Sequence, residues 1–273
     1  MEYGIFLLCS TAALLGTLVG FGGGIFVVPA MVLGFGIPIE VAIGVTAMSL
    51  FPSSLISSLG NLRNKNIDFR LLFALEPFTM VGAFGGAFLT SLLPSGPLKV
   101  IFGLFLILMS FKMGAKKKSS ESSETSELPP KPWIRGFRKL NELKPVIHGP
   151  GYSVGLWAAS VFGMLAGVIA GLFGIGGGVL KTPLMLNVFK VPVRTATATS
   201  LAMIMVTSLI SGTTHFQLGH YSYPVLIPAV LGFVTGAVIG LWVGVKLTDQ
   251  MIRKAISVTL FLAGVATFAH TLM

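Results

Sequence analysis

The chain contains one glycine-rich motif twice, at a constant offset of 154 positions (Gly20 to Gly174). Gly20-Phe21-Gly22-Gly23-Gly24 in the first half corresponds to Gly174-Ile175-Gly176-Gly177-Gly178 in the second. The matching residues extend far beyond the glycines and include Pro29 and Pro183, Ser54 and Ser208, Ser57 and Ser211, and Gly82 and Gly236. The sequence is therefore a tandem duplication in which each copy carries one apolar segment broken by glycines. In membrane proteins, such a pair of broken segments usually marks a transport site.

The composition is that of a protein embedded in a lipid bilayer. Hydrophobic residues make up 53% of the chain and charged residues only 10%, whereas a soluble domain carries about a quarter charged residues. The net charge of +10 resembles that of a nucleic-acid-binding protein. However, the Lys and Arg residues stand between apolar runs, as they do in the cytoplasmic loops of membrane proteins. We therefore expect a polytopic membrane protein with no nucleic-acid partner.

The apolar segments divide the chain into two membrane repeats, residues 1–113 and 151–273, joined by a polar linker of residues 114–150. Within the linker, residues 133–140 could form a short amphipathic surface helix. Five segments are predicted in each repeat, at 3–19, 25–35, 41–60, 71–93 and 98–113, and at 153–173, 179–189, 195–213, 224–245 and 252–272. The second segment of each repeat is too short to cross a hydrocarbon core, which needs about twenty residues. It should form a helical hairpin with the first segment, with the glycine tip inside the membrane.

Basic residues predict opposite orientations for the two repeats. The loop after the third segment contains Arg63, Lys65 and Arg70 in repeat one, whereas the matching loop around Gly219 contains no Lys or Arg. Conversely, the loop before the third segment is basic only in repeat two, at Lys190. Because Lys and Arg accumulate in cytoplasmic loops, equivalent loops should lie on opposite sides of the membrane. The repeats are then inverted, the linker is cytoplasmic, both termini are non-cytoplasmic, and the two glycine tips meet near the midplane.

The glycine tips are candidate anion-binding elements. The first N–H groups of a helix lack intrahelical partners and, with the helix dipole, attract anions. Glycine has no Cβ, so an anion can approach the backbone closely. The alternative is that the glycines only allow close helix packing. The candidate binding residues at the tips are Gly22, Gly23, Gly24, Gly176, Gly177 and Gly178.

Two ionisable residues lie inside predicted membrane segments. Lys181 stands three residues beyond the second tip, where the first repeat has Val27. It could bind a substrate anion, or it could extend its ammonium group to the cytoplasmic interface. Glu76 is a candidate proton carrier for coupling. The alternative for Glu76 is an ion pair with a nearby cation, namely Arg63, Lys65 or Arg70.

Hydroxyl side chains concentrate in the third segment of each repeat. They could donate hydrogen bonds to an oxyanion, or they could bond to their own or a neighbouring helix. Thr46 and Thr199-Ser200 are favoured because they lie near the segment starts. The remaining candidates for substrate binding are Ser54, Ser57, Ser208 and Ser211.

The duplicated GxGGG hairpins with their prolines, Ala198-Thr199-Ser200, and Gly219-His220-Tyr221-Ser222-Tyr223 together resemble the TauE/SafE family of sulfite exporters. The resemblance covers both repeats and implies an inner-membrane permease for small sulfur-containing anions such as sulfite, sulfoacetate or other organosulfonates. Export is the usual direction in this group, and import is the alternative. Related thiosulfate importers use cysteines near the substrate, but this chain has only Cys9, so that mechanism is not expected. Repeat one has Val45-Thr46 where Thr-Ser is typical, so Val45 is assigned no role.

The sequence thus predicts an all-α, multi-pass protein of the cell inner membrane, built from two inverted five-segment repeats. The predicted function is secondary transport, with export favoured, of a small sulfur oxyanion or organosulfonate by alternating access. The alternative is a passive anion channel. No nucleophile–base pair or metal-ligand spacing is visible, so we expect no enzyme activity, cofactor or metal. The sequence specifies neither the coupling ion nor an oligomeric state.

Overall fold

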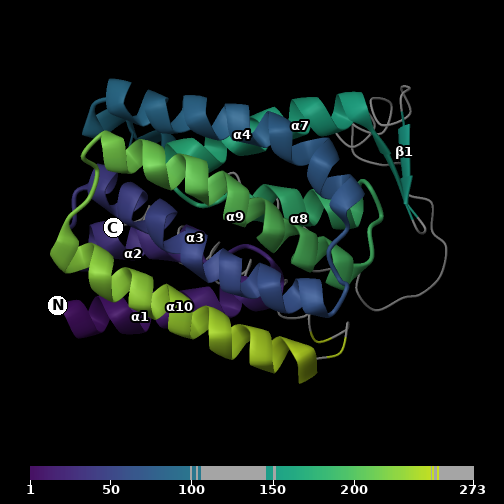
Figure 1. The fold of residues 1–273 in the computed structure, drawn as a ribbon. Helices are drawn as coiled ribbons and strands as arrows, with labels where there is room; N and C mark the ends of the chain where they lie inside the picture. The colour runs from purple at the N-terminus through teal and green to yellow at the C-terminus, as the bar shows by residue number, and fades with distance from the viewer. Residues whose placement is uncertain are drawn as a thin grey trace.

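The computed structural model describes residues 1–98, 100–102, 104–105, 146–149, 152–246, 248 and 251. Its described part is mostly helical (Figure 1). The elements are α1 (Glu2–Val19), α2 (Gly24–Gly34), α3 (Ile39–Arg63), α4 (Phe69–Leu92), β1 (Val146–Gly149), β2 (Tyr152–Gly155), α7 (Leu156–Phe173), α8 (Gly178–Asn187), α9 (Val193–Gln217) and α10 (Tyr223–Lys246). Six described helices are long and apolar enough to cross a membrane, namely α1, α3, α4, α7, α9 and α10.

The two halves of the chain interlock through their helices. The first helix of each half packs against the fourth helix of the other half, so that α1 pairs with α10 and α4 with α7. The third helices, α3 and α9, pack against each other between these pairs (Figure 1). Glycines permit the close approach, because Cβ atoms at the equivalent positions Gly82 and Gly236 would collide with the backbones of α7 and α1, respectively.

The equivalent helices α3 and α9 run in opposite directions. A Cβ atom at Gly44, near the start of α3, would collide with the carbonyl oxygen of His220, just beyond the end of α9. At the other end, the Asp68 N–H, just beyond α3, donates to Thr199 Oγ1 near the start of α9 at 3.0 Å. The start of each third helix therefore lies beside the end of its counterpart (Figure 1).

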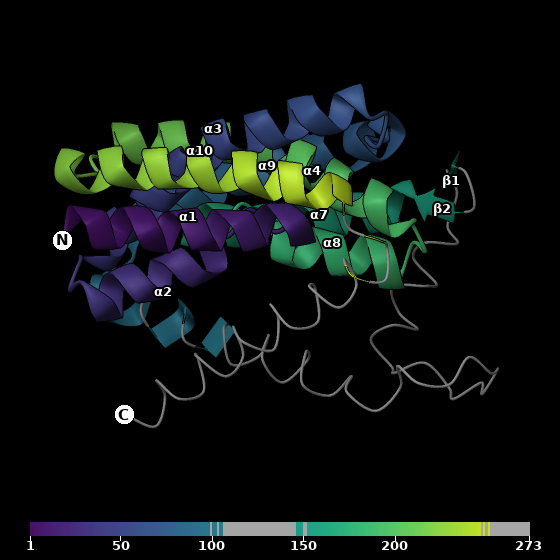
Figure 2. The ribbon, with the colours of Figure 1, turned by 90° about the horizontal axis from the view of Figure 1, so that it is seen from below.

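Glycines break the chain at both predicted hairpin tips. α1 ends at Gly20, with φ of 80°, and α2 begins after Gly23, with φ of 95°. Likewise, α7 ends at Gly174, with φ of 64°, and α8 begins after Gly177, with φ of 73°. A side chain is disfavoured at such positive φ values, so glycine allows the tight reversal. The short helices α2 and α8 lie on the same side of the long helices (Figure 2).

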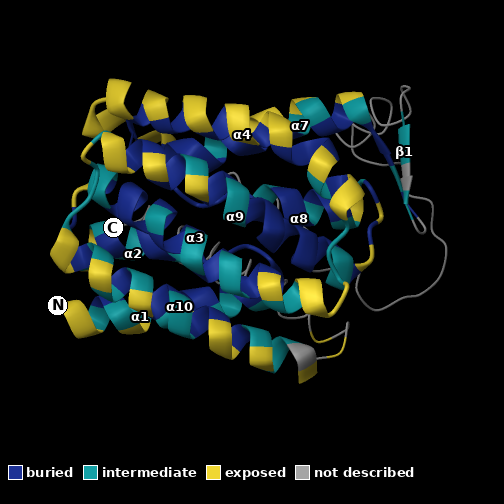
Figure 3. Cartoon of the chain, in the orientation of Figure 1, coloured by how far each residue is buried: buried dark blue, intermediate teal, exposed yellow. Residues whose placement is uncertain are grey.

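The outer faces of the long helices are apolar and exposed, whereas α3 and α9 are the most buried of the six (Figure 3). Exposed outer side chains include Leu7 of α1, Phe73 and Phe84 of α4, and Trp242 of α10. Monomeric soluble proteins rarely expose such extensive apolar surface to water. Surfaces of this kind suit contact with lipid, as expected for a multi-pass membrane protein.

The all-helical prediction missed two short strands. Residues 152–155 form β2, which pairs antiparallel with β1, so the helix predicted from residue 153 begins at Leu156 instead. The linker prediction, residues 114–150, therefore includes a short strand at its end. The segment predicted at 252–272 and the surface helix predicted at 133–140 lie outside the described residues, as does most of the segment predicted at 98–113.

Candidate substrate site at the glycine tips

The two glycine tips contact each other at the centre of the molecule. A Cβ atom at Gly24 would lie 3.0 Å from Ile175 Cα in the second tip. In the reverse direction, a Cβ atom at Gly178 would lie 2.6 Å from the carbonyl oxygen of Gly20. Both distances are shorter than ordinary side-chain contacts, so the meeting point of the tips has room for backbone only.

Each tip presents backbone donors that are not used in the fold. The N–H groups of Gly24 and Ile25, and those of Gly178 and Val179, meet no acceptor in the described part of the chain. These are the first residues of α2 and α8, where the helix dipoles place partial positive charge. Two opposed helix N-termini can together bind a small anion without any charged side chain.

Two apolar side chains occupy the space beside the tips. A Cβ atom at Gly22 would lie 2.8 Å from Leu50 Cδ2, and one at Gly176 would lie 2.8 Å from Ile204 Cγ2. Leu50 and Ile204 are equivalent residues of α3 and α9, and both are buried. Sequence reasoning missed them, although the constant offset of the repeats pairs them. An anion can bind between the tips only if these two side chains move, so the candidate site is closed in this structure.

Gly23 and Gly177 face away from the opposite tip. A Cβ atom at Gly23 would collide with the carbonyl oxygen of Ala12 in α1, and one at Gly177 would lie 3.2 Å from that of Ala166 in α7. Each of these glycines therefore packs its short helix onto the first arm of its own hairpin. At these two positions, the glycines serve close helix packing, which was the alternative to anion binding. The contact between the tips is bordered by the other four candidates, Gly22, Gly24, Gly176 and Gly178.

Lys181 and Glu76 form a buried ion pair. Lys181 Nζ donates to Glu76 Oε2 and to Thr207 Oγ1, both at 2.9 Å, and Thr207 Oγ1 donates to Glu76 Oε1 at 2.6 Å. The Lys181 side chain is 0% exposed and that of Glu76 is 3% exposed. Two alternatives from the sequence were therefore wrong. Glu76 does not pair with the basic loop residues, and Lys181 does not reach an interface.

The hydroxyls near the tips join the two halves of the chain. Ser200 Oγ and Thr182 Oγ1 both donate to the carbonyl oxygen of Gly20, at 2.8 and 2.9 Å. Thr182 was not a candidate from the sequence. Thr46 lies against the first tip with its methyl group, which would be 3.1 Å from a Cβ atom at Gly24. Its buried hydroxyl has no partner among the described residues, so it is free to bind an anion.

The remaining candidate serines lie farther along α3 and α9. Ser57 Oγ donates to the Ser53 carbonyl at 3.0 Å and Ser208 Oγ to the Met205 carbonyl at 3.2 Å. Ser54 and Ser211 are buried, and their hydroxyls have no partner in the described part of the chain. Ser54 is eight residues beyond Thr46, about 12 Å along a helix. A small anion at the tips therefore cannot contact these serines at the same time.

Metal-binding groups are not seen at this site. Within the described ranges, no three His, Cys, Asp or Glu side chains come together in a way that could hold a metal ion. The polar groups that converge are backbone amides, hydroxyls and one lysine–glutamate pair. Six potential membrane spans and two broken helices around such groups are features of the membrane transporter class.

Comparison with known proteins places the chain in a family of this class. Residues 5–267 match the family described as "Sulfite exporter TauE/SafE", and the chain belongs to that family. Probable membrane transporter protein YunE of Bacillus subtilis is 30% identical over 93% of this chain and 92% of its own length. Probable membrane transporter protein YdhB of the same organism is 25% identical, covering 91% of this chain and 92% of YdhB.

A plant relative extends the comparison. Sulfite exporter TauE/SafE family protein 6 of Arabidopsis thaliana is 23% identical, covering 97% of this chain and 78% of its own length. No solved structure matches the chain. The chain is thus a multi-pass membrane transporter of the TauE/SafE type, and the comparisons extend across both repeats.

Proposed function

We propose that the protein is a secondary transporter that exports a small sulfur-containing anion, such as sulfite or an organosulfonate, by alternating access. One observation carries the proposal: two opposed helix N-termini meet, and four of their backbone N–H groups have no acceptor among the described residues. A sulfonate or sulfite group presents several acceptor oxygens and negative charge, which match these donors. The names of the family and of the plant relative add support for sulfite as the substrate class.

The proposed topology is that of inverted repeats in the inner membrane, with both termini outside the cytoplasm. Two observations support it. First, the equivalent helices α3 and α9 run antiparallel. Second, a loop that is basic in one repeat is not basic in the other; for example, Lys65 corresponds to Gly219. The end of the molecule that carries β1 and the α3–α4 loop is then cytoplasmic.

Coupling is proposed to operate through the Lys181–Glu76 pair. A substrate anion and the Glu76 carboxylate compete for the same ammonium group, because Lys181 is the buried cation one turn beyond the second tip. Protonation of Glu76 removes its charge and leaves Lys181 available to the substrate. Proton and anion binding are therefore linked, so the two ions move in the same direction. Export is then driven by the outward gradient of the substrate and, for a dianion such as sulfite, by the membrane potential, whereas an inward proton gradient drives accumulation.

Flux measurements test the function. Purified protein in proteoliposomes should accumulate labelled sulfite or a short sulfonate against its gradient when a proton gradient is imposed, and sulfate and thiosulfate serve as competing anions. An uncoupled flux that only follows the substrate gradient would instead identify a passive anion channel. Absence of flux for every one of these anions would refute the proposed substrate class.

Cysteine labelling tests the topology. Asn64→Cys, just after α3, and Gln217→Cys, at the end of α9, are exposed positions at opposite ends of the antiparallel pair. In a Cys9→Ala background, a membrane-impermeant thiol reagent applied to intact cells should label Gln217→Cys and spare Asn64→Cys. Permeabilised cells should label both. Equal labelling of the two positions in intact cells would contradict inverted repeats.

A further inference from the structure

Two lysines occupy backbone conformations that favour glycine. Lys65 and Lys190 have φ values of 54° and 61°, and they are the only non-glycine residues with positive φ in the described ranges. The equivalent residues in the other repeat are both glycines: Gly219, with φ of 75°, and Gly36, with φ of 65°. Two different turns therefore each occur twice, once with glycine and once with lysine at the position of positive φ. A side chain in this conformation costs free energy that glycine avoids.

Both lysines lie at the same end of the molecule. Lys65 follows α3 and Lys190 follows α8, and these loops lie at the end that carries β1 (Figure 1). Gly36 and Gly219 occupy the corresponding turns at the opposite end. Both lysine side chains are exposed, and neither forms an ion pair with a described residue. Exposed cations with no ion-pair partner among the described residues thus replace the glycines at one end of the molecule.

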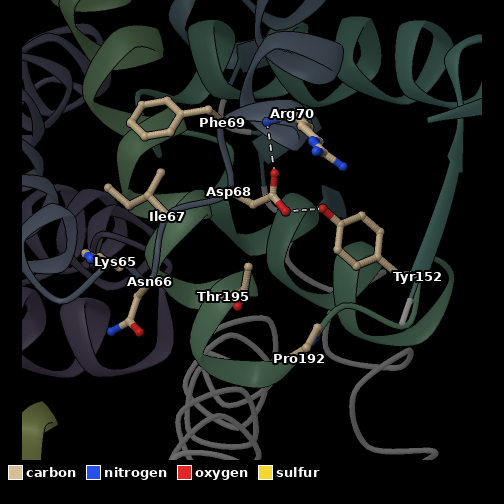
Figure 4. Close-up of a pocket in the computed structure, with 9 residues that line it drawn as sticks. All are labelled: Lys65, Asn66, Ile67, Asp68, Phe69, Arg70, Tyr152, Pro192 and Thr195. Carbon is tan, nitrogen blue, oxygen red and sulfur yellow. Dashed lines mark hydrogen bonds between the residues drawn. The ribbon is translucent and has the colours of Figure 1, made fainter. Parts of the chain in front are cut away.

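A pocket opens at this end of the molecule. Its volume is about 360 Å³, and Figure 4 shows that residues of the α3–α4 loop, of β2 and of the start of α9 line it. Lining residues include Lys65, Asp68, Arg70, Tyr152, Pro192 and Thr195. Lys65 lines the pocket itself, whereas Lys190 lies two residues before the lining residue Pro192, in the loop between α8 and α9.

The single carboxylate in the pocket lining is already engaged. Asp68 accepts hydrogen bonds from the Tyr152 hydroxyl and from the backbone N–H of Arg70 (Figure 4). The backbone N–H of Leu71, at the start of α4, donates to the same carboxylate. Burial, followed by the hydrogen bond and charge of Asp68, raises the pKa of Tyr152, so the phenol remains a donor to the carboxylate. The carboxylate of Asp68 therefore has partners already, and Lys65 and Arg70 outnumber it among the charged residues of the lining.

Helix α9 connects the pocket with the first glycine tip. Thr195 lines the pocket, and Thr199, one turn later, accepts the Asp68 N–H at 3.0 Å. Ser200 then contacts the carbonyl oxygen of Gly20 in the first tip at 2.8 Å. Five residues of helix, about 7 Å, therefore separate the pocket from the tips. The contact of Asp68 with Thr199 lies between them.

We propose that this pocket is the mouth through which the transported anion enters, and that Lys65 and Lys190 concentrate the anion there. The proposal rests on the proposed function for the identity of the anion, which is a small sulfur oxyanion or sulfonate. Cations at the rim attract such an anion from the cytoplasm, and low-dielectric walls strengthen the local field. The fold retains strained lysines where glycine would be more stable, because the charge serves the entrance. Separation of Asp68 from Thr199 then opens the way to the tips.

The test measures the local potential with thiol reagents of opposite charge. Thr195→Cys in a Cys9→Ala background is treated with a sulfonatoethyl and with a trimethylammonioethyl methanethiosulfonate, and each rate is divided by the rate with free cysteine. The normalised rate of the anionic reagent should exceed that of the cationic one by roughly tenfold at low ionic strength. High salt should reduce the ratio, because it screens exposed charges.

The double substitution Lys65→Gly and Lys190→Gly provides the decisive comparison. It should lower the rate ratio toward one, because both positive charges are removed. It should leave the melting temperature equal or higher, because glycine adopts a positive φ without steric strain. The matched control, Lys65→Arg with Lys190→Arg, keeps charge and strain and should preserve the ratio. A ratio near one in the parent, or a ratio unchanged in the glycine variant, would overturn the proposal. Labelling of Thr195→Cys does not require transport. If no flux is detected but the ratio of labelling rates is as expected, the proposed substrate class is wrong and the proposed positive entrance is retained.

Discussion

Glu76→Gln and Lys181→Met, made singly, should each destabilise the protein by about 3–5 kcal/mol, whereas the double variant should recover most of that loss. Each single change leaves its former partner buried and unpaired, because both side chains are almost fully enclosed. The double variant removes both charges and keeps the volumes similar. The measurement is the free energy of unfolding of the purified protein in mixed detergent micelles, with the four proteins compared as a double-mutant cycle.

Transport should follow a different pattern from stability. The double variant should be folded and yet fail to accumulate substrate under a proton gradient, because it lacks both the buried cation and the protonatable group. Thr207→Val is the matched control, since it removes one hydroxyl from the same cluster and keeps both charges. It should cost about 1 kcal/mol and retain coupled flux. Proton-driven accumulation by the double variant would show that the pair is structural only.

Gly178→Ala should weaken binding of the substrate. The added methyl group would lie 2.5 Å from Ile204 Cδ1 and 2.6 Å from the Gly20 carbonyl oxygen, so the two tips must move apart. Overpacking of this kind typically costs 1–3 kcal/mol, and we expect binding to weaken by at least about tenfold, or 1.4 kcal/mol. Isothermal titration with the best substrate from the flux assay measures the change.

Gly34→Ala is the control for this substitution. Gly34 ends α2, ten residues from the first tip, and a Cβ atom there would meet nothing within 4 Å. Its binding and flux should equal those of the parent. Gly23→Val would be a poor test, because the side chain would strike α1 and disrupt the hairpin itself. If Gly178→Ala binds like the parent, the tips serve only to pack the helices.

Local features of the fold could be predicted from the sequence because their causes are local. The breaks at Gly20 and Gly174 have a positive φ, and a glycine in the sequence indicates such a position because it lacks a Cβ atom. The short helices after them were also predicted, because their apolar runs are too short to span. The constant offset of the repeats anticipated equivalent elements in both halves. Their antiparallel course was inferred from loop charges and stays a prediction for the membrane topology.

Contacts between distant segments could not be predicted in the same way. Lys181 and Glu76 are 105 residues apart, and their meeting depends on how α8 packs against α9 beside α4. A sequence-based search for a partner favours neighbouring cations, and here that choice was wrong. β2 was missed because Tyr152–Gly155 is too short to show an alternating pattern that differs from the start of an apolar helix.

The pairing of α1 with α10 and of α4 with α7 has a consequence for biosynthesis. α1 leaves the ribosome first among the described helices, but the surface it packs against is translated only after all of the other described helices. The glycine-containing contacts of α10 must therefore be made last, and α1 must wait in the lipid with its partner face uncovered. Neither half of the chain can therefore complete its helix pairing without the other.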